Sequence, residues 1–352
     1  MRFLTRRNIG AIVGLVLMVA VGAFAYWKQL LSTPLSIKEP MIYEVRQGMG
    51  ANQVVAQLQE SGVLAKVWPL KIWLKLNPDK AAVKAGEYQI PIGVNACELM
   101  ALLVSGNTVH YQVTLPEGLR FSEALAILQQ QDKLTIQSAE MSYPEIMQYV
   151  SGRPLSRVPH HEGQFFPDTY QFYKGVSDLQ ILKRAYDKMQ RVLDEEWQQV
   201  DSVAQPYDNA YQVLIMASII EKETGVAYER PRIAGVFVQR LQQRMRLQTD
   251  PTVIYGLGDR YQGNITRRHL QEKTAYNTYR INGLPPTPIA LPGREAIHAA
   301  LHPLKDGSLY FVARGDGSHE FSSTLEAHNR AVRRYQIDKR KKNYQSAPTT
   351  QN

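Results

Sequence analysis

The sequence of 352 residues contains a single cysteine, Cys97, and this scarcity excludes two kinds of site. One thiol cannot form an intramolecular disulfide bond or a zinc site built from several thiolates. At position 97 it also lies too far from the N-terminus to be a lipidation anchor. At roughly 150 residues per domain, the length allows about two domains plus appendages, which is enough to bury a core.

The body of the chain lacks an excess of charge of either sign. The net charge of +9 comes from the two ends, since residues 1–28 hold four basic side chains and no acid, and residues 333–342 hold six basic side chains against Asp338. The part of the chain between the two ends has no net positive charge to attract a phosphate backbone, so we expect no nucleic-acid partner. Residues 339–352 are predicted to form a basic, flexible tail.

Long apolar runs are also scarce, and only one is long enough to cross a membrane. Residues 8–27 contain 20 residues without a charge, and these span about 30 Å as a helix, the thickness of the bilayer's hydrocarbon. Three arginines precede the run and Lys28 follows it, so the positive-inside rule places the N-terminus in the cytoplasm, with Tyr26 and Trp27 at the far interface. We predict a cytoplasmic tip and anchor over residues 1–28, with an exported body.

A cleaved signal peptide is the alternative, because Ala23-Phe24-Ala25 resembles a cleavage site after an apolar stretch. We favour the anchor, because the run is long for a signal peptide and ends in interfacial aromatic residues. Under either interpretation the body is exported.

After a short polar linker at residues 29–40, a strand–turn–helix pattern occurs three times. The copies align on Gly48, Gly93 and Gly118, each with a strand-like segment before it and apolar helix residues six and ten positions after it. One copy cannot bury its own helix face, so we predict that the three pack as one small α+β module over residues 41–132. Such modules resemble the LysM-like domains that bind glycan strands, and a spacer is the alternative hypothesis.

We predict a larger domain of mixed α/β structure over residues 133–338. Residues 213–220 are apolar on every face and too few to cross a membrane, which is typical of a helix in a soluble core. A second helix is expected from about Pro231, and a terminal hairpin is expected to turn on Gly315-Asp-Gly317 before a last helix from about Thr324. The predicted fold class is therefore α+β.

Two glutamates, Glu221 and Glu223, end the apolar helix. The unsatisfied carbonyl groups at a helix C-terminus disfavour negative charge, and burial adds to this, so both effects raise a glutamate pKa toward that of a working acid. Two residues apart on a helix, the side chains point about 200° away from each other, so only one can face a cleft. Physical chemistry alone does not distinguish Glu221 from Glu223 as the acid. The alternative hypothesis is that both are solvated residues at a helix end without a catalytic role.

Five segments of the sequence together resemble the YceG-like endolytic murein transglycosylases. They are Phe165-Phe-Pro-Asp-Thr-Tyr170, Ala217-Ser-Ile-Ile-Glu-Lys-Glu-Thr224, Arg246-Leu-Gln-Thr-Asp-Pro-Thr-Val-Ile-Tyr-Gly256, Thr274-Ala-Tyr-Asn-Thr-Tyr279 and Gly283-Leu-Pro-Pro286. In that family the catalytic residue is the second glutamate of the Glu-x-Glu pair, which is Glu223 here. The resemblance implies cleavage between N-acetylmuramic acid and N-acetylglucosamine without water, with Glu223 as acid and then as base and a 1,6-anhydro ring as product.

Amide and hydroxyl side chains near the glutamates are candidates for a sugar-binding groove, together with aromatic rings that stack on sugar faces. They are Gln248, Thr249, Asp250, Tyr255, Tyr276, Asn277 and Tyr279. The alternatives are that Asp250 caps a helix opened by Pro251 and that the tyrosines belong to the core. We predict no metal site and no cofactor, since the spacing of His319, Glu320 and His328 matches no zinc pattern.

The sequence thus predicts an inner-membrane, periplasmic lytic transglycosylase that cuts nascent glycan strands of peptidoglycan. Penicillin-binding proteins are partners implied by the resemblance alone. Two alternatives stay open: a muramidase that uses water, with Asp250, Asp168 or Glu162 as its second carboxylate, and a wall-binding scaffold without catalysis.

Overall fold

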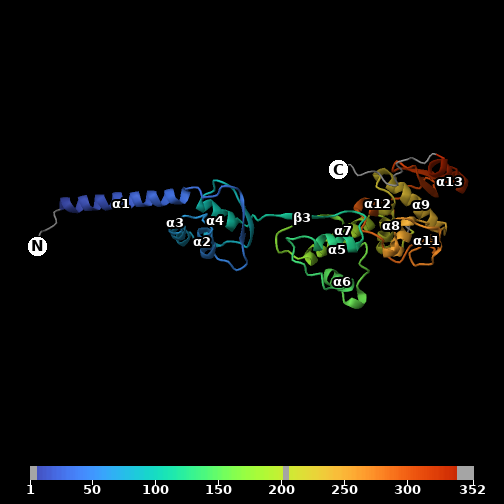
Figure 1. Ribbon diagram of the computed structural model, residues 1–352, viewed down its shortest axis with the longest axis horizontal. Helices are drawn as coiled ribbons and strands as arrows, with labels where there is room; N and C mark the ends of the chain where they lie inside the picture. Colours follow the sequence, from blue (N-terminus) through green and yellow to red (C-terminus); the bar gives the residue numbers. More distant parts are fainter. Residues whose placement is uncertain (1–5, 201–205, 339–352) are drawn as a thin grey trace. The chain divides into compact units, whose positions relative to one another are not determined.

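The computed structural model describes residues 6–200 and 206–338 of the chain (Figure 1). The predicted tail at 339–352, and residues 1–5 of the predicted cytoplasmic tip, lie outside this range. The chain divides into two compact units, of which unit 1 comprises residues up to Tyr111 together with Gln171–Lys174, and unit 2 the remainder. Among the described residues the secondary structure is a mixture of helices and two-stranded sheets, which confirms the predicted mixture of α and β structure.

Helix α1 (Arg6–Ser32) begins the described chain and contains a span, Gly10–Ser32, that is long and apolar enough to cross a membrane. The helix continues five residues beyond Trp27. The predicted linker at 29–40 is also packed, because Leu31 and Ile37 are buried in the core of unit 1 and the Leu35 N–H donates to the Val94 carbonyl at 2.9 Å. A separate polar linker was therefore the wrong expectation, since its apolar side chains find partners in that core.

Unit 1 holds the first two of the predicted strand–turn–helix copies. They are β1 (Met41–Val45) with α2 (Ala51–Glu60), and β2 (Gly86–Ile90) with α4 (Ala96–Ser105). β1 and β2 pair in antiparallel register, with Tyr43 opposite Tyr88. α3 (Trp68–Leu76) and the 3-10 helix η1 (Pro78–Ala81) lie between the copies in sequence. The apolar helix positions predicted from the repeat are buried in one core, namely Val54, Leu58, Leu99 and Leu103.

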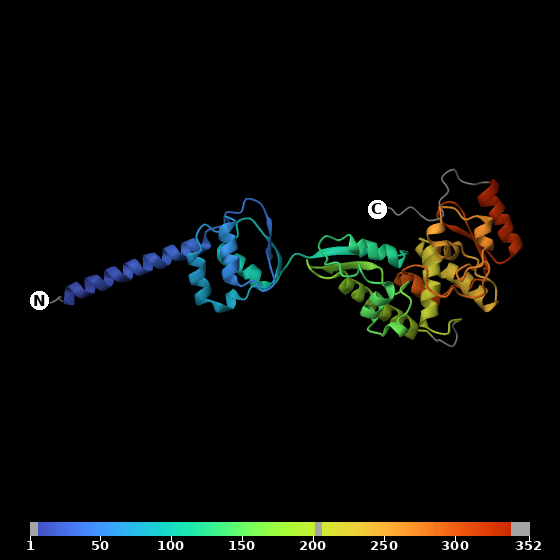
Figure 2. The ribbon, with the colours of Figure 1, turned by 60° about the horizontal axis from the view of Figure 1, so that its bottom comes forward.

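The third copy does not join the first two. It consists of β3 (Tyr111–Leu115) and α5 (Phe121–Gln129), and β3 pairs with β4 (Asp168–Phe172), a strand that the sequence analysis does not predict (Figures 1 and 2). From Gln112 onward this copy belongs to unit 2. The predicted single module over 41–132 is thus corrected, because β3 finds its hydrogen-bonding partner later in the chain.

β4 opens a fourth copy of the same pattern, in which Gly175 is followed by α7 (Asp178–Gln198). The glycine of every copy has a positive φ, a backbone conformation that is strained for residues with a side chain. The angles are 82° at Gly48, 80° at Gly93, 76° at Gly118 and 89° at Gly175. The described residues therefore contain four copies in two pairs.

Matching hydrogen bonds show that the two pairs repeat one arrangement. The Tyr88 hydroxyl donates to the Lys84 carbonyl at 2.8 Å, and the Tyr170 hydroxyl donates in the same way to the Phe166 carbonyl at 2.6 Å. In both copies the amide of the accepting residue, Lys84 or Phe166, donates at 3.0 Å to a helix carbonyl, that of Leu103 or Ala185. A two-copy unit has thus been built twice in this chain.

The rest of unit 2 surrounds α8 (Ala210–Glu223), whose residues 213–220 are all buried, as the sequence predicts. α8 contacts α7, α9, α10 and α12. The predicted second helix, terminal hairpin and last helix are also present. The further elements are α6 (Tyr143–Ser151), η2 (Leu155–Arg157), η4 (Ala227–Glu229), α9 (Arg230–Gln242), α10 (Asp250–Leu257), η5 (Gly258–Arg260), α11 (Arg267–Gln271), α12 (Arg294–Leu301), β5 (Tyr310–Ala313), β6 (His319–Ser322), α13 (Leu325–Val332) and the π-helical turn η6 (Arg333–Asp338).

The equivalence of Tyr88 and Tyr170 is testable by removing each hydroxyl. Tyr88→Phe and Tyr170→Phe should each lower the free energy of unfolding by about 1 kcal/mol, because the backbone carbonyl of Lys84 or Phe166 loses its donor. Urea unfolding of the detergent-solubilised chain measures this. Tyr173→Phe, at a side chain 55% exposed, is the matched control and should change nothing. Loss at only one of the two buried positions would contradict the equivalence.

Candidate active site

Unit 2 contains a cleft of about 1000 Å³ at the C-terminal end of α8. One part of its lining comes from that helix end and from residues 247–251, where α10 begins, and another comes from the β5–β6 hairpin and α13. Of the residues predicted from the sequence, five line the cleft. They are Glu223, Gln248, Thr249, Asp250 and Tyr279.

Glu223 is the last residue of α8, and its carboxyl group is partly buried at the edge of the cleft. The Thr249 hydroxyl donates a hydrogen bond to its Oε1. Loss of water around the carboxyl group raises its pKa to about 7, and the nearby negative charge of Asp250 adds to the effect. The hydrogen bond from Thr249 and the positive charge of Arg240 act in the opposite direction and are outweighed. The group can therefore give up and regain a proton near neutral pH.

Glu221 also borders the cleft, but its carboxyl oxygens are occupied by other parts of unit 2. Oε2 accepts a hydrogen bond from the Gly293 N–H at 3.0 Å, and Oε1 lies 3.6 Å from Nη2 of Arg230. Burial raises the pKa of this group as well. These contacts tie the end of α8 to α9 through Arg230 and to the proline- and glycine-rich segment before α12 through Gly293, so both carboxyl oxygens of Glu221 have partners within the protein.

A cluster of buried threonines holds the turn that carries Thr249. The Thr249 N–H donates to the Thr278 hydroxyl at 3.0 Å, and the Thr252 hydroxyl donates to the Thr249 carbonyl at 2.8 Å. Gln248 has a φ of 54°, which is uncommon for a residue with a side chain, and its N–H is held by the Thr278 carbonyl at 3.2 Å. Thr252 and Thr278 are not predicted from the sequence, although both lie in segments that carry the resemblance.

Asp250 and Tyr279 meet at the cleft, where the tyrosine hydroxyl donates to Asp250 Oδ1 at 2.8 Å. Burial raises the pKa of Tyr279, so this hydroxyl stays protonated and keeps donating. Thr249, not Asp250, is the N-cap residue of α10. The carboxylate of Asp250 is thus exposed to the cleft instead of capping the helix.

The other three groove candidates, Tyr255, Tyr276 and Asn277, do not line this cleft. The Tyr255 hydroxyl donates to Glu162 Oε2 at 3.1 Å, and the Tyr276 hydroxyl is 2.8 Å from that of Thr287. Both rings pack against the core of unit 2. This placement matches the alternative that these tyrosines belong to the core.

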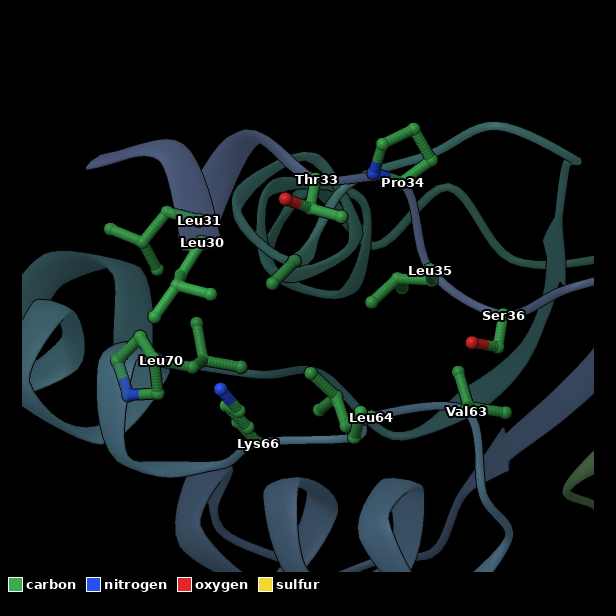
Figure 3. Close-up of a pocket in the computed structure, with 13 residues that line it drawn as sticks. Leu30, Leu31, Thr33, Pro34, Leu35, Ser36, Val63, Leu64, Lys66 and Leu70 are labelled. Carbon is green, nitrogen blue, oxygen red and sulfur yellow. The ribbon is translucent and has the colours of Figure 1, made fainter. Parts of the chain in front are cut away.

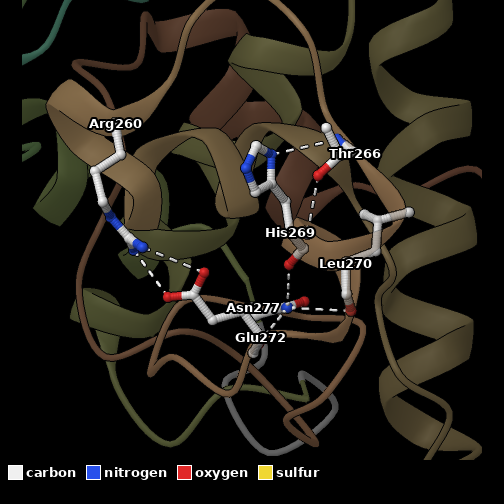
Figure 4. Close-up of polar contacts among 6 residues, drawn as sticks. All are labelled: Arg260, Thr266, His269, Leu270, Glu272 and Asn277. Atoms are coloured by element: carbon white, nitrogen blue, oxygen red, sulfur yellow. Dashed lines mark hydrogen bonds and ion pairs between the residues drawn. The ribbon is translucent and has the colours of Figure 1, made fainter.

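Asn277 is 1% exposed and organises the segment around α11 (Figure 4). Its Nδ2 donates to the carbonyl groups of His269, Leu270 and Glu272, at 3.1, 3.3 and 2.6 Å. Nearby, the Glu272 carboxylate pairs with Arg260 at 2.9 Å. The amide is therefore fully used within the protein, and we assign Asn277 to the scaffold of the site and not to the lining of the cleft.

Arg240 is a cleft residue that the sequence analysis misses. It is 7% exposed, and its guanidinium donates to the carbonyls of Leu309 and Leu247, each at 2.7 Å, and lies over the Tyr310 ring. The sequence does contain a pattern that indicates burial of Arg240. Position 240 falls three and four residues after Phe237 and Val236, on the buried face of α9. A charged residue on such a face is rarely buried without a specific partner or task.

Two of the three predicted second carboxylates lie elsewhere. Burial raises the pKa of Glu162 to about 7, but its Oε1 accepts from the Phe121 N–H at 2.9 Å and it does not line the cleft. Asp168 forms an ion pair with Lys188. Asp250 is therefore the member of the predicted set that borders the cleft together with Glu223.

One group in the described part of the chain brings metal-ligating atoms together, within 4.8 Å of one another: Glu196, His298 and His302. Its carboxylate already accepts from Arg294 at 2.9 Å and lies 2.8 Å from Nδ1 of His298, and the group does not line the cleft. His319 does border the cleft, where its Nδ1 is 2.7 Å from Oε2 of Glu229. These contacts are ion pairs and hydrogen bonds within the protein.

Comparisons with known proteins find relatives along most of the chain. The endolytic murein transglycosylase of Bacillus subtilis is 29% identical over 338 residues, which cover 91% of this chain and 92% of that protein. The endolytic murein transglycosylase of Streptococcus pneumoniae serotype 2 is 26% identical over 92% of this chain, which spans 64% of that longer protein. A crystal structure of a yceG-like protein from Listeria monocytogenes aligns with a TM-score of 0.54 and 30% identity, and covers 84% of this chain and 100% of that chain.

The family model described as the YceG-like family matches residues 43–334, which include parts of both units and every residue discussed at the cleft. The resemblance stated from the sequence is thereby confirmed. The chain belongs to the YceG-like family.

Proposed function

We propose that this protein is a membrane-anchored, endolytic lytic transglycosylase that cleaves the bond between N-acetylmuramic acid and N-acetylglucosamine in nascent glycan strands. Its enzyme class, a lyase acting on peptidoglycan, is that of the relatives named above. The single observation that carries the finer proposal is the carboxyl group of Glu223, with a pKa of about 7, at the edge of a cleft of about 1000 Å³. That volume lies at the upper end for ligand sites and suits several sugar rings.

Glu223 acts twice in the proposed reaction. As an acid it protonates the glycosidic oxygen, and the bond from that oxygen to C1 of the muramyl residue breaks. As a base it then takes the proton of the muramyl 6-hydroxyl, whose oxygen bonds to C1 and closes the 1,6-anhydro ring. The proton is returned to Glu223 and no water is consumed. An internal nucleophile is already held close to C1, so one carboxyl group is sufficient.

Neighbouring residues support these two steps. The Thr249 hydroxyl, held by the threonine cluster, orients the carboxyl group through its hydrogen bond. The negative charge of Asp250 and the positive charge of Arg240 adjust the pKa in opposite directions. Gln248, Asp250 and Tyr279 offer amide, carboxylate and hydroxyl groups to the hydroxyls of the sugar.

The location of the enzyme is part of the proposal. With α1 as a single span and the N-terminus in the cytoplasm, unit 2 and the part of unit 1 that follows α1 lie in the periplasm, close to newly made strands. In unit 1 the LysM-like module serves as a glycan-binding element or as a spacer. Penicillin-binding proteins that polymerise glycan are the expected partners.

A muramidase that uses water is the second candidate, and a specific observation favours it. Asp250 is a carboxylate that borders the same cleft as Glu223, and a hydrolase needs such a pair. The two mechanisms leave different products, which makes them separable by experiment.

The first prediction concerns Glu223. Glu223→Gln keeps the shape of the side chain but removes the proton donor, so the rate of strand cleavage should fall at least ~100-fold while the fold survives. Mass spectrometry of digested, purified strands measures the rate, and circular dichroism checks the fold. Glu326→Gln, at a side chain that is 84% exposed on α13, is the matched control. Unchanged cleavage by Glu223→Gln would refute the assignment.

The second prediction concerns the products. Cleavage by the internal 6-hydroxyl yields fragments that are lighter by one water than hydrolysis products and have no reducing muramyl end. Digestion in water labelled with heavy oxygen should leave the fragments unlabelled. Incorporation of the label, together with a reducing end, would instead establish the muramidase and give Asp250 the second role.

The third prediction concerns pH and stability. The pKa of Glu223 is raised from 4.5 to about 7 in the folded protein. Its stabilising contribution is therefore fully present below pH 4.5 and is lost as the pH rises through 7, by about 1.4 kcal/mol per pKa unit. Glu223→Gln should thus be more stable than the parent protein at pH 8, with the difference shrinking toward pH 5. Urea unfolding across this range measures it, and a difference independent of pH would contradict the raised pKa.

A further inference from the structure

The outer face of α3 is apolar, although among the described residues its side chains do not belong to the core of unit 1. Trp68, Ile72 and Leu76 recur every four residues along the helix and are 45%, 45% and 67% exposed. Leu70 and Leu74, on the opposite face, are buried in the core. Large apolar side chains grouped along one exposed helix face mark an interaction surface.

Positive charge follows one edge of this stripe. Lys71 and Lys75 are exposed, and at 100° per residue they lie beside Trp68 and Ile72 on the helix surface. Residues 61–78 contain no acidic side chain. An apolar stripe with lysines along its edge is typical of helices that lie in the interface of a membrane and contact anionic lipid.

The position of α3 beside α1 gives this partner further support. The Trp27 indole nitrogen donates to the Pro69 carbonyl at 3.1 Å, and Lys66 Nζ lies 3.4 Å from the Tyr26 hydroxyl. These contacts place the start of α3 level with the two aromatic residues. The helix from Gly10 to Tyr26 is about 25 Å long, close to the thickness of the bilayer's hydrocarbon, so this level corresponds to the outer interface.

The junction between the two helices is itself mainly apolar. A pocket of about 180 Å³ lies there, and its lining includes Leu30, Leu64 and Leu70 (Figure 3). The Lys66 ammonium group is the charged group in this lining. The apolar surface of α1 therefore continues toward α3.

We propose that α3 docks on the outer surface of the membrane, with Trp68, Ile72 and Leu76 inserted at the boundary of headgroups and acyl chains and Lys71 and Lys75 on lipid phosphates. This proposal rests on the anchoring by α1 that is part of the proposed function. Docking gives unit 1 a second attachment to the membrane beside α1.

A single fluorescent probe in the full chain tests the docking. In a Cys97→Ser background, the probe is attached at Ile72→Cys, and the chain is placed in nanodiscs that contain phosphatidylglycerol. Ile92→Cys, at an isoleucine of unit 1 that is 58% exposed, is the matched control. Quenching by nitroxide-labelled lipid should be at least threefold stronger at position 72 than at position 92, and quenching by iodide should be weaker.

Two results would overturn the proposal. Equal iodide quenching at positions 72 and 92 would place α3 in water. Shielding of position 72 from both iodide and lipid nitroxide would indicate a protein partner, such as a second copy of the chain. A third probe at Leu17→Cys reports on the anchor, so that failure of α3 to dock is distinguished from failure of α1 to insert.

The lysines are tested separately. Lys71→Glu with Lys75→Glu should reduce the lipid quenching at position 72 at least twofold, because repulsion replaces attraction to the phosphates. Arg267→Glu with Arg268→Glu makes the same change of charge at exposed residues of α11 and should leave the quenching unaltered. An equal effect of both pairs would contradict a local contact of α3 with lipid.

Discussion

The loss of water around the Glu223 carboxyl group is the constraint on which the proposed chemistry depends. A carboxyl group in open solvent is ionised near neutral pH and donates no proton, whereas at this helix end partial burial raises its pKa to about 7. The effect requires that the end of α8 stay in place, and the burial of residues 213–220 holds the helix in unit 2. Thr249 and Arg240 keep the pKa from rising further, so both proton transfers stay accessible.

A second constraint, the need of every strand for a partner, decides how the chain divides. β1 and β2 form hydrogen bonds with each other within unit 1. β3 pairs with β4, which belongs to a copy more than fifty residues later in the chain. The repeated tyrosine hydrogen bonds at Tyr88 and Tyr170 show that the second pair reproduces the first. In the second pair, the last helix is α7, which contacts α8, the helix that carries Glu223.

Much of the fold follows from local patterns, whereas the site follows from them only in part. The buried helix at 213–220 and the hairpin around Gly315-Asp-Gly317 are predicted because periodicity and turn chemistry are local properties. Residues 248–250 reach the cleft with Tyr279, but Tyr255, Tyr276 and Asn277 do not. Residues 274–279 form no helix or strand, so no helical or strand periodicity in the sequence indicates which of their side chains face the cleft. β4 was missed because aromatic and proline residues precede it and hide the repeat.

The amino-acid sequence by itself determined the apolar span, the strand–turn–helix repeat, the buried helix and the family, because each depends on residue types at short, regular spacing. Only the tertiary structure gave a physical reason, beside the resemblance, to propose Glu223 instead of Glu221 as the acid, since both occupy the same helix end with the same chemistry. Gly293 and Arg230, which hold Glu221, and Thr249, which meets Glu223, come from distant segments. The choice therefore depends on which backbone and side-chain groups are packed against each carboxyl group, and spacing along the chain does not contain that information.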